Sequence, residues 1–525
     1  MIVPVKSPWW CCAAILVYLG CGRIGFDPNG GGDGGRDGSP ILGDGSLISG
    51  TESIYIKAAN SGFGDWFGHR VVLSRDGTTL AVAAPSEAST SPGINGDQTN
   101  NAASGCGAVY VFARSASSWV QQAYVKASNP TSYDYFGHDI ALSDDGNTLA
   151  VGALQEGSGA TGINGNQTSE VAFGSGAAYV FQRTGSAWAQ QAYVKASNTA
   201  GFDSFGQSVA LSGDGNVLVV GAEGEDSGAT GINANQADNS VPSAGAVYVF
   251  TRVSVTWSQT AYLKPSTVGD FDAFGHAVAI SGDGSTIAVA AVVEDSGAPG
   301  VNGNQADESQ PGSGAVFVFV RANPWVQQAY LKASNPGAED LFGTAVALSA
   351  TGNRAVIGAK FEDSRARGVD GEQADESAPA SGAAYVFTRA GGVTWTQEAY
   401  LKAFNSDPQD TFGTSVAISP DGTGIVIGAP AEDSAAVGIG RDPDDNTMNE
   451  SGAVYLLQRV GESWQPVAYG KATNTRPNSA FGADVSLAAG TLVVGAYGED
   501  GVGMGVEADP TTRGAPSSGA VYVYQ

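Results

Sequence analysis

Short runs of Val, Leu and aromatic residues alternate along the chain with stretches rich in Gly, Asp and Ser. One typical unit holds four such runs, at 205–212, 217–222, 245–250 and 257–264. Residues of these types in runs this short predict β-strands, and Ser-Gly-Asp-Gly between the first two runs predicts a tight hairpin. Since no segment shows a sustained helical period, we expect an all-β protein.

The four-run unit repeats seven times. The dipeptide Phe-Gly opens each repeat, at intervals of 68 to 70 residues, with its aromatic residue at Phe67, Phe136, Phe205, Phe274, Phe342, Phe412 and Phe481. Seven units of four antiparallel strands predict a seven-bladed β-propeller, in which radial packing protects the short strand edges. We call the four runs of a unit A, B, C and D.

The two ends of the repeat array predict a closed ring. The seventh unit stops after its C run, 519–525, and lacks a D run. The missing run stands alone before the first unit, where Ile54-Tyr-Ile-Lys-Ala58 matches Ala123-Tyr-Val-Lys-Ala127. We therefore expect the N-terminal strand to complete the last blade, and the propeller to occupy residues 51–525.

The unit also resembles a known repeat. Phe-Gly is followed by Val-Gly-Ala or Gly-Ala-Pro, as in Gly428-Ala-Pro430, and then by Gly-Ala-Val-Tyr. This pattern resembles the FG-GAP repeat of integrin α-subunit N-terminal propellers and, more closely, of bacterial FG-GAP proteins with long acidic loops. The resemblance covers residues 54–525. It implies a seven-bladed propeller that serves extracellular binding or adhesion.

One feature of integrin-type repeats is missing from the unit. Those repeats often place an Asp-x-Asp-x-Asp-Gly calcium loop between strands A and B, whereas the corresponding turn here is short, as in Ser74-Arg-Asp-Gly77. A single Asp before Gly favours a turn, and Ca²⁺ needs six to eight oxygen ligands. The calcium sites of that hairpin are therefore not carried over.

The first 20 residues predict an export signal. A sparse positive charge at Lys6 precedes an apolar stretch at 9–20, which is shorter than the about 20 residues that span a bilayer. Leu19-Gly20-Cys21 resembles a bacterial lipobox, which implies a lipid on Cys21, although Tyr18 stands where that pattern prefers Leu. The Gly- and Asp-rich stretch at 21–50 predicts a flexible tether. The expected location is the bacterial outer membrane or cell surface, with plain secretion and an uncleaved anchor as alternatives.

Charge and cysteine content narrow the class further. The chain carries 52 acidic and 25 basic residues, a net charge of −27, which argues against nucleic acid or an anionic membrane surface as a partner. Any membrane contact is expected through the lipid alone. Cys106 is the only cysteine of the predicted propeller, so packing must stabilise the fold without internal disulfides. We expect no reactive role for Cys106, because no basic residue is near it in the sequence.

The B–C loops and D–A connections leave the same end of each blade, and they hold most of the acidic residues. In units three to five the B–C loops share a skeleton of oxygen-bearing side chains, which suits a hard cation such as Ca²⁺. The alternative is that they only organise the loops through Asx-turns. The candidate ligands are Glu225, Asp226, Asn233, Asn235, Asp238, Glu294, Asp295, Asn302, Asn304, Asp307, Glu362, Asp363, Asp370, Glu372 and Asp375.

Charged residues recur at two further positions. An acid two places before Phe-Gly is predicted to cap backbone amides, with a share in a ligand site as the alternative, at Asp65, Asp134, Asp203, Asp272, Asp340 and Asp410. A lysine at the end of each D run is predicted to pair with the loop acids, at Lys57, Lys126, Lys195, Lys264, Lys332, Lys402 and Lys471.

Aromatic residues and histidines also recur. Tryptophans that open the D runs are predicted to pack against the sheets, with sugar stacking as the alternative, at Trp119, Trp188, Trp257, Trp325, Trp395 and Trp464. His69, His138 and His276 each follow a Phe-Gly. We interpret them as equivalent positions produced by repetition, which do not converge on one site.

The motifs indicate a binding protein rather than an enzyme. No Ser–His–Asp, HExxH, Walker or CxxC arrangement is present. We predict an exported, lipid-anchored surface module that recognises an extracellular protein or glycan through its acidic loop face. The alternatives are a structural envelope or matrix protein without a discrete ligand, and a glycan-acting enzyme. The most deviant loops, 440–445 and 503–509, are interpreted as drift or as a ligand-specific patch.

Overall fold

The computed structural model describes residues 48, 53–116, 118–440 and 443–525. The predicted export signal, the lipidation site Cys21 and the tether at 21–50 lie outside the described residues, except for Ile48. This residue, which falls within the predicted tether, is buried in the apolar core of the last blade. The described residues contain no helix long and apolar enough to cross a membrane.

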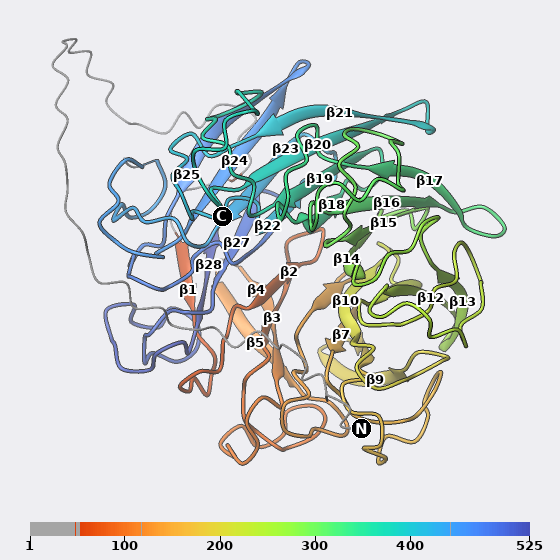
Figure 1. The fold of residues 1–525 in the computed structure, drawn as a ribbon. Helices are drawn as coiled ribbons and strands as arrows, with labels where there is room; N and C mark the ends of the chain where they lie inside the picture. Colours follow the sequence, from red (N-terminus) through yellow and green to blue (C-terminus); the bar gives the residue numbers. More distant parts are fainter. Residues whose placement is uncertain (1–47, 49–52, 117, 441–442) are drawn as a thin grey trace, which may run out of the picture. The chain divides into compact units, whose positions relative to one another are not determined.

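The described residues form seven sheets of four strands each, arranged as the blades of a propeller (Figure 1). Blade 1 contains β2 (Arg70–Leu73), β3 (Thr79–Ala84), β4 (Ala108–Ser115) and β5 (Ser118–Val125). Blade 2 contains β6 (Ile140–Leu142), β7 (Thr148–Ala153), β8 (Ala177–Thr184) and β9 (Ala187–Val194). Blade 3 contains β10 (Phe205–Leu211), β11 (Val217–Ala222), β12 (Ala246–Val253) and β13 (Thr256–Leu263).

The remaining blades repeat the same antiparallel order. Blade 4 contains β14 (Phe274–Ile280), β15 (Thr286–Ala291), β16 (Ala315–Val320) and β17 (Val326–Leu331). Blade 5 contains β18 (Phe342–Leu348), β19 (Arg354–Ala359), β20 (Ala383–Ala390) and β21 (Thr394–Leu401). Blade 6 contains β22 (Ser415–Ile418), β23 (Gly424–Ala429), β24 (Ala453–Val460) and β25 (Ser463–Gly470). Blade 7 contains β26 (Asp484–Ala488), β27 (Thr491–Ala496), β28 (Ala520–Tyr524) and β1 (Ser53–Ile56).

The A strands form the inner wall of the ring, because each one contacts the A strands of the neighbouring blades. Strand β10, for example, lies between β6 and β14 (Figure 1). Strand order within each sheet then places B, C and D successively outward. The predicted seven-bladed, all-β architecture is confirmed.

The ring closes in the predicted way. Strand β1 pairs antiparallel with β28, with Ile54 opposite Val523, and so supplies the D strand of blade 7. A second set of bonds joins the connection before blade 1 to blade 7, since the Trp66 amide donates to the Ser517 carbonyl at 3.1 Å. The same bond recurs between blades 1 and 2, where the Tyr135 amide donates to the Gly105 carbonyl at 2.9 Å.

The glycines of the repeated motif are explained by this junction. Gly107 opens strand C of blade 1 with a φ of +76°, and a Cβ there would lie 2.0 Å from the Phe136 carbonyl oxygen of the next blade. Gly137 has a φ of +92°, and a Cβ would lie 3.1 Å from the Ala108 carbonyl oxygen. Only glycine tolerates both the left-handed conformation and this close backbone approach.

The apolar core lies between adjacent blades. One cluster combines Val109 and Val111 of blade 1 with Val151 and Tyr179 of blade 2, and the ring of Phe136 meets Tyr179 edge-on at 5.3 Å. The predicted packing role of the D-strand tryptophans is confirmed, because all six are buried: Trp119, Trp188, Trp257, Trp325, Trp395 and Trp464.

Candidate functional site

The B–C loops and the D–A connections lie together at one end of the blades, as predicted. We call their residues the loop face. The connection before each blade contacts the B–C loop of that blade, as where Asn129 Nδ2 donates to the Gln167 carbonyl at 3.3 Å. It also contacts the B–C loop of the preceding blade, where the Tyr133 amide donates to the Ser104 carbonyl at 2.9 Å.

Each blade buries one lysine–glutamate ion pair beneath the loop face, which confirms the predicted pairing of the D-strand lysines with loop acids. The Nζ to Oε2 distances lie between 2.6 and 3.1 Å. The pairs are Lys57–Glu499, Lys126–Glu87, Lys195–Glu156, Lys264–Glu225, Lys332–Glu294, Lys402–Glu362 and Lys471–Glu432.

The glutamate of each pair holds the loop face together. In blade 2, Glu156 Oε2 accepts from Lys195 Nζ, while Oε1 accepts from the Tyr193 hydroxyl at 2.8 Å and from Asn129 Nδ2 at 2.9 Å. These bonds tie the B–C loop to strand D and to the D–A connection. A buried charge needs such compensation, because its desolvation is costly.

The structure gives most of the candidate calcium ligands other partners. Glu225, Glu294 and Glu362 belong to the buried ion pairs. Asp226, Asp295 and Asp363 each accept from a backbone amide 17 residues later in the same B–C loop. The side chains of Asn233, Asn302 and Asp370 accept from the amides of the D-strand residues Tyr262, Tyr330 and Tyr400.

The remaining candidate ligands mostly form local turns. Amides two residues further along donate to the side chains of Asn235, Asn304, Glu372, Asp307 and Asp375, and Asp238 makes no hydrogen bond with another described residue. Among the described residues, no group of three or more His, Cys, Asp or Glu side chains is placed to hold a metal ion. The bonds agree with the loop-organising alternative, and calcium binding stays a prediction.

The aspartates before Phe-Gly are caps, as predicted. Asp203 Oδ2 accepts from the Ala200 amide at 2.7 Å, so the side chain caps its own D–A connection. The same bond to the amide three residues earlier recurs at Asp65, Asp134, Asp272, Asp340 and Asp410. Burial raises the pKa of the Asp203 carboxyl to about 7, since the charged form loses its hydration.

The histidines occupy equivalent positions, as interpreted, but the expectation that they do not converge was wrong for two of them. The rings of His69 and His138 lie 5.7 Å apart, because these equivalent positions lie just before the neighbouring innermost strands β2 and β6. Burial, together with the nearby Arg70, lowers the pKa of His138 to about 3. The third imidazole, His276, lies with its Nδ1 2.7 Å from Glu223 Oε2.

Cys106 is buried beside the ion pair of blade 1. No basic residue is near it in the sequence, but the fold brings Lys126 close enough to act on it electrostatically. Burial nevertheless raises the pKa of the thiol to about 11, which keeps it protonated and unreactive at neutral pH. In blade 2 the equivalent position holds Ser175, whose Oγ accepts from Lys195 Nζ at 2.7 Å.

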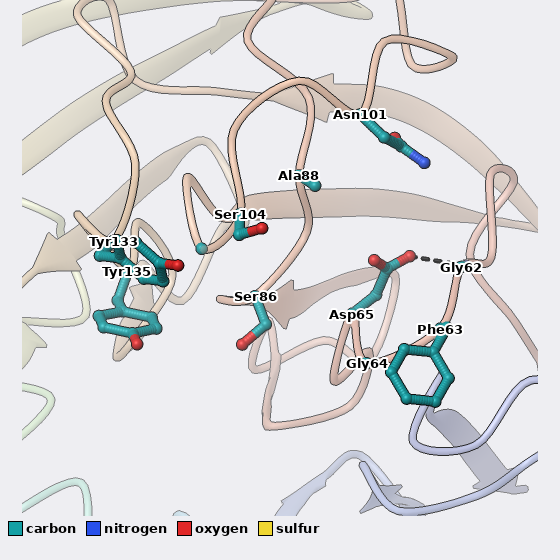
Figure 2. Close-up of a pocket in the computed structure, with 11 residues that line it drawn as sticks. Gly62, Phe63, Gly64, Asp65, Ser86, Ala88, Asn101, Ser104, Tyr133 and Tyr135 are labelled. Carbon is teal, nitrogen blue, oxygen red and sulfur yellow. Dashed lines mark hydrogen bonds between the residues drawn. The ribbon is translucent and has the colours of Figure 1, made fainter.

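Sequence reasoning missed a cavity between blades 1 and 2 (Figure 2). It has a volume of about 420 Å³ and is lined by the D–A connections at 62–65 and 133–135 and by parts of the B–C loop between them. Exposed aromatic residues gather on the loop face of the first four blades, at Phe63, Trp66, Tyr133, Phe173, Phe202 and Phe271, and one more, Phe361, lies in the B–C loop of blade 5. The signal in the sequence was the pair of aromatics that flanks the acid in Tyr133-Asp134-Tyr135.

Comparison with known proteins decides the family. The FG-GAP repeat matches residues 119–181, 188–250, 257–319, 325–387 and 395–457, which together are more than half of the chain. The protein belongs to the FG-GAP repeat family. This FG-GAP propeller is also similar in fold to the solved structure of a presumed 6-phosphogluconolactonase from Bacteroides uniformis, at 11 % identity and a TM-score of 0.41, over 77 % of this chain and 86 % of that one. None of the curated proteins compared with the chain matches it.

Proposed function

We propose that this FG-GAP propeller is an exported, lipid-anchored binding module of the cell surface, which recognises an extracellular protein or glycan through its loop face. The observation behind the proposal is the set of exposed aromatic side chains on one part of that face. Large exposed apolar groups that gather on one face mark interaction sites more often than structural ones. The role is binding or adhesion, without a chemical step.

The position before the capping aspartate supports this proposal. This residue has a positive φ in every connection, and it is Tyr133, Phe202 and Phe271 before blades 2, 3 and 4. Before blades 5, 6 and 7 it is Glu339, Gln409 and Asn478. Because polar residues make the same turn, the fold does not require an aromatic side chain there, and the exposed rings are better explained by a ligand.

Two alternatives make different predictions. A structural envelope or matrix protein needs no exposed aromatic residues on one part of its loop face. A glycan-acting enzyme needs an acid and a base near a bound sugar. The imidazoles of His69 and His138 do not serve as such groups, because burial lowers their pKa values far below neutrality.

The proposal is tested by binding of the full chain, purified in detergent, to arrays of extracellular matrix proteins and glycans. The triple variant Tyr133→Asn/Phe202→Asn/Phe271→Asn keeps a residue type that tolerates positive φ. The matched control is Val255→Asn/Val393→Asn, which removes exposed apolar side chains from the C–D turns at the opposite end of the blades. The triple variant should lose binding at least about tenfold, and the control should retain it. Equal losses in both variants contradict the proposal.

The membrane anchor has a separate test. In cells that express the full chain, labelled palmitate should be incorporated into the protein and should be lost in Cys21→Ser. The paired variant Cys12→Ser, which alters a cysteine within the signal, should retain the label. Protein that is found in the culture medium without palmitate label would instead support plain secretion.

A further inference from the structure

The cavity between blades 1 and 2, bounded by the connections before these two blades, is open because one wall residue, Ser104, is small. Tyr133, Phe202 and Phe271 donate their amides to the carbonyls of Ser104, Phe173 and Pro242, respectively. Ser104 therefore corresponds to Phe173 of blade 2. There the ring of Phe173 meets Phe202 at 5.7 Å, whereas the small Ser104 leaves the space open. At the junctions before blades 1, 5 and 6 the equivalent residue is a proline, and at the junction before blade 7 it is an asparagine: Pro516, Pro311, Pro379 and Asn449.

Aromatic side chains stand on both sides of the cavity. Figure 2 shows Phe63 beside Asp65 on one side and Tyr133 with Tyr135 on the other. The two tyrosine rings lie 6.3 Å apart with an angle of 56° between their planes. Phe63 is 79 % exposed and Tyr133 is 54 % exposed, so the rings offer apolar surface that the protein itself does not cover.

Tyr133 and Tyr135 are also unusual residues for their backbone. Their φ angles are +69° and +53°, a conformation that costs about 1–2 kcal/mol for a residue other than glycine. The exposed ring of Tyr133 recovers little of this by burial. An asparagine or glycine forms the same turn with less strain, as Gly64 does before blade 1. The same positive φ recurs in every connection, so the strain belongs to the turn, and two tyrosines in it are what distinguish this connection.

Polar groups without partners line the same cavity. The side chains of Ser86, Asn101 and Ser104 and the hydroxyls of Tyr133 and Tyr135 make no hydrogen bond with another described residue. Asp65 adds a carboxylate, of which Oδ2 accepts from the Gly62 amide at 2.7 Å. The cavity thus combines hydroxyl and amide donors, carboxylate and hydroxyl acceptors, and apolar ring faces.

This combination fits a sugar ring. A pyranose has hydroxyls around its edge and C–H groups on its faces, so it hydrogen-bonds at the rim and stacks on aromatic rings. A volume of about 420 Å³ lies in the range of about 300–1,000 Å³ that is typical of small-molecule sites. An anionic sugar is disfavoured by Asp65 and by the net charge of −27.

We propose that the cavity between blades 1 and 2 binds one pyranose unit of a neutral glycan, which stacks on Tyr133 and is hydrogen-bonded by Asp65, Ser86 and Ser104. This assignment rests on the proposed function of the loop face and specifies its ligand class. It also places the main site at the first blade junction, whereas the sequence had singled out the loops of blades 6 and 7.

The test measures binding of the methyl glycosides of glucose, galactose, mannose, fucose and N-acetylglucosamine to the full chain in detergent, by saturation-transfer NMR and calorimetry. At least one glycoside should bind the wild type. Tyr133→Asn should weaken that binding about tenfold. Ser104→Phe, which copies Phe173 of blade 2, should abolish it. The control Val255→Asn should bind as the wild type does, and thermal unfolding should show that every variant is folded.

Three outcomes overturn the assignment. The first is that none of the five glycosides binds. The second is that sugar binding survives in folded Ser104→Phe. The third is that a Gly-Arg-Gly peptide binds at this cavity in place of every sugar, since a cation also stacks on aromatic rings. In each case the array experiment with the triple variant decides separately whether the loop face binds a ligand, so the two proposals fail independently.

Discussion

Lys195 Nζ lies 2.9 Å from Glu156 Oε2, and neither side chain has more than 1 % of its surface exposed. The pair connects strand D of blade 2 to the B–C loop of the same blade, which forms part of the loop face. Since the same pair occurs in all seven blades, the shape of the loop face depends on buried charges rather than on the loops alone.

Removal of one partner of this pair should strongly destabilise the folded protein. Lys195→Met leaves Glu156 buried without its cation, and the free energy of unfolding should fall by about 3–5 kcal/mol. The double variant Lys195→Met/Glu156→Gln should lose less, because no uncompensated charge remains. Urea unfolding measures both. The control Arg75→Gln breaks an exposed pair with Asp144, which should cost at most about 1 kcal/mol; an equal loss at both sites would contradict a special role for burial.

The buried capping aspartates should make stability depend on pH. The folded Asp203 carboxyl has its pKa raised to about 7 by burial, whereas in the unfolded chain it titrates near about 3.9. Between these values the folded state binds more protons, so the free energy of unfolding falls as pH rises and levels off above about 7. Asp203→Asn cannot ionise and lacks this loss.

Urea unfolding between pH 4 and pH 8 tests this expectation. The stability of Asp203→Asn relative to the wild type should increase with pH, by up to about 1.4 kcal/mol for each unit of pKa shift. As a control, Asp97→Asn alters an exposed aspartate whose pKa is lowered by hydrogen bonds from Thr99, and it should show no such rise. A constant difference between Asp203→Asn and the wild type would exclude a raised pKa.

The contact of Gly107 with the next blade should not tolerate a side chain. In Gly107→Ala the added methyl meets the Phe136 carbonyl oxygen, and the loss of stability should be about 3 kcal/mol or more. Gly93 has a similar φ of +82° with open space around it, so Gly93→Ala reports the backbone strain alone, about 1–2 kcal/mol. Thermal unfolding of the two variants separates the stability cost of the close backbone approach from the cost of the backbone strain.

Calcium should have little effect on stability, because most of the candidate ligands already accept hydrogen bonds from backbone amides or pair with lysines. After chelation, the thermal midpoint of the full chain should be the same with and without millimolar Ca²⁺. A ligand that binds only the folded state raises the midpoint with concentration. A rise that disappears in Asp238→Asn, which changes the candidate ligand without a hydrogen bond, would place a cation in that loop.

Much of the architecture was predictable because it depends on repetition. Phe67 and Phe481 mark the same point of the first and last units, and the match of Ile54–Ala58 with Ala123–Ala127 shows which strand completes blade 7. A lysine that recurs once per blade in an acidic chain also indicates its partner, since a buried amine needs a carboxylate. These inferences need only the order and spacing of residues.

The candidate site was less predictable, because it depends on differences between units rather than on what they share. The exchange of Phe173 for Ser104 opens a cavity, but its effect is visible only once the tyrosines at 133 and 135 are placed opposite Phe63. The meeting of His69 and His138 was misjudged for a related reason. Sequence spacing shows that two positions are equivalent, and it does not give the distance between them.

Repetition, strand order, ring closure and the pairing of charges were thus determined by the sequence itself, because each follows from local patterns that recur in every unit. Only the tertiary structure decided which residues of different units meet. The blades curve into a ring in which the A strands lie innermost, so histidines 69 residues apart come into contact at the centre. On the loop face, the same packing places Phe63 and Tyr133 on the two sides of one cavity, because backbone bonds between neighbouring blades set the distance between their connections.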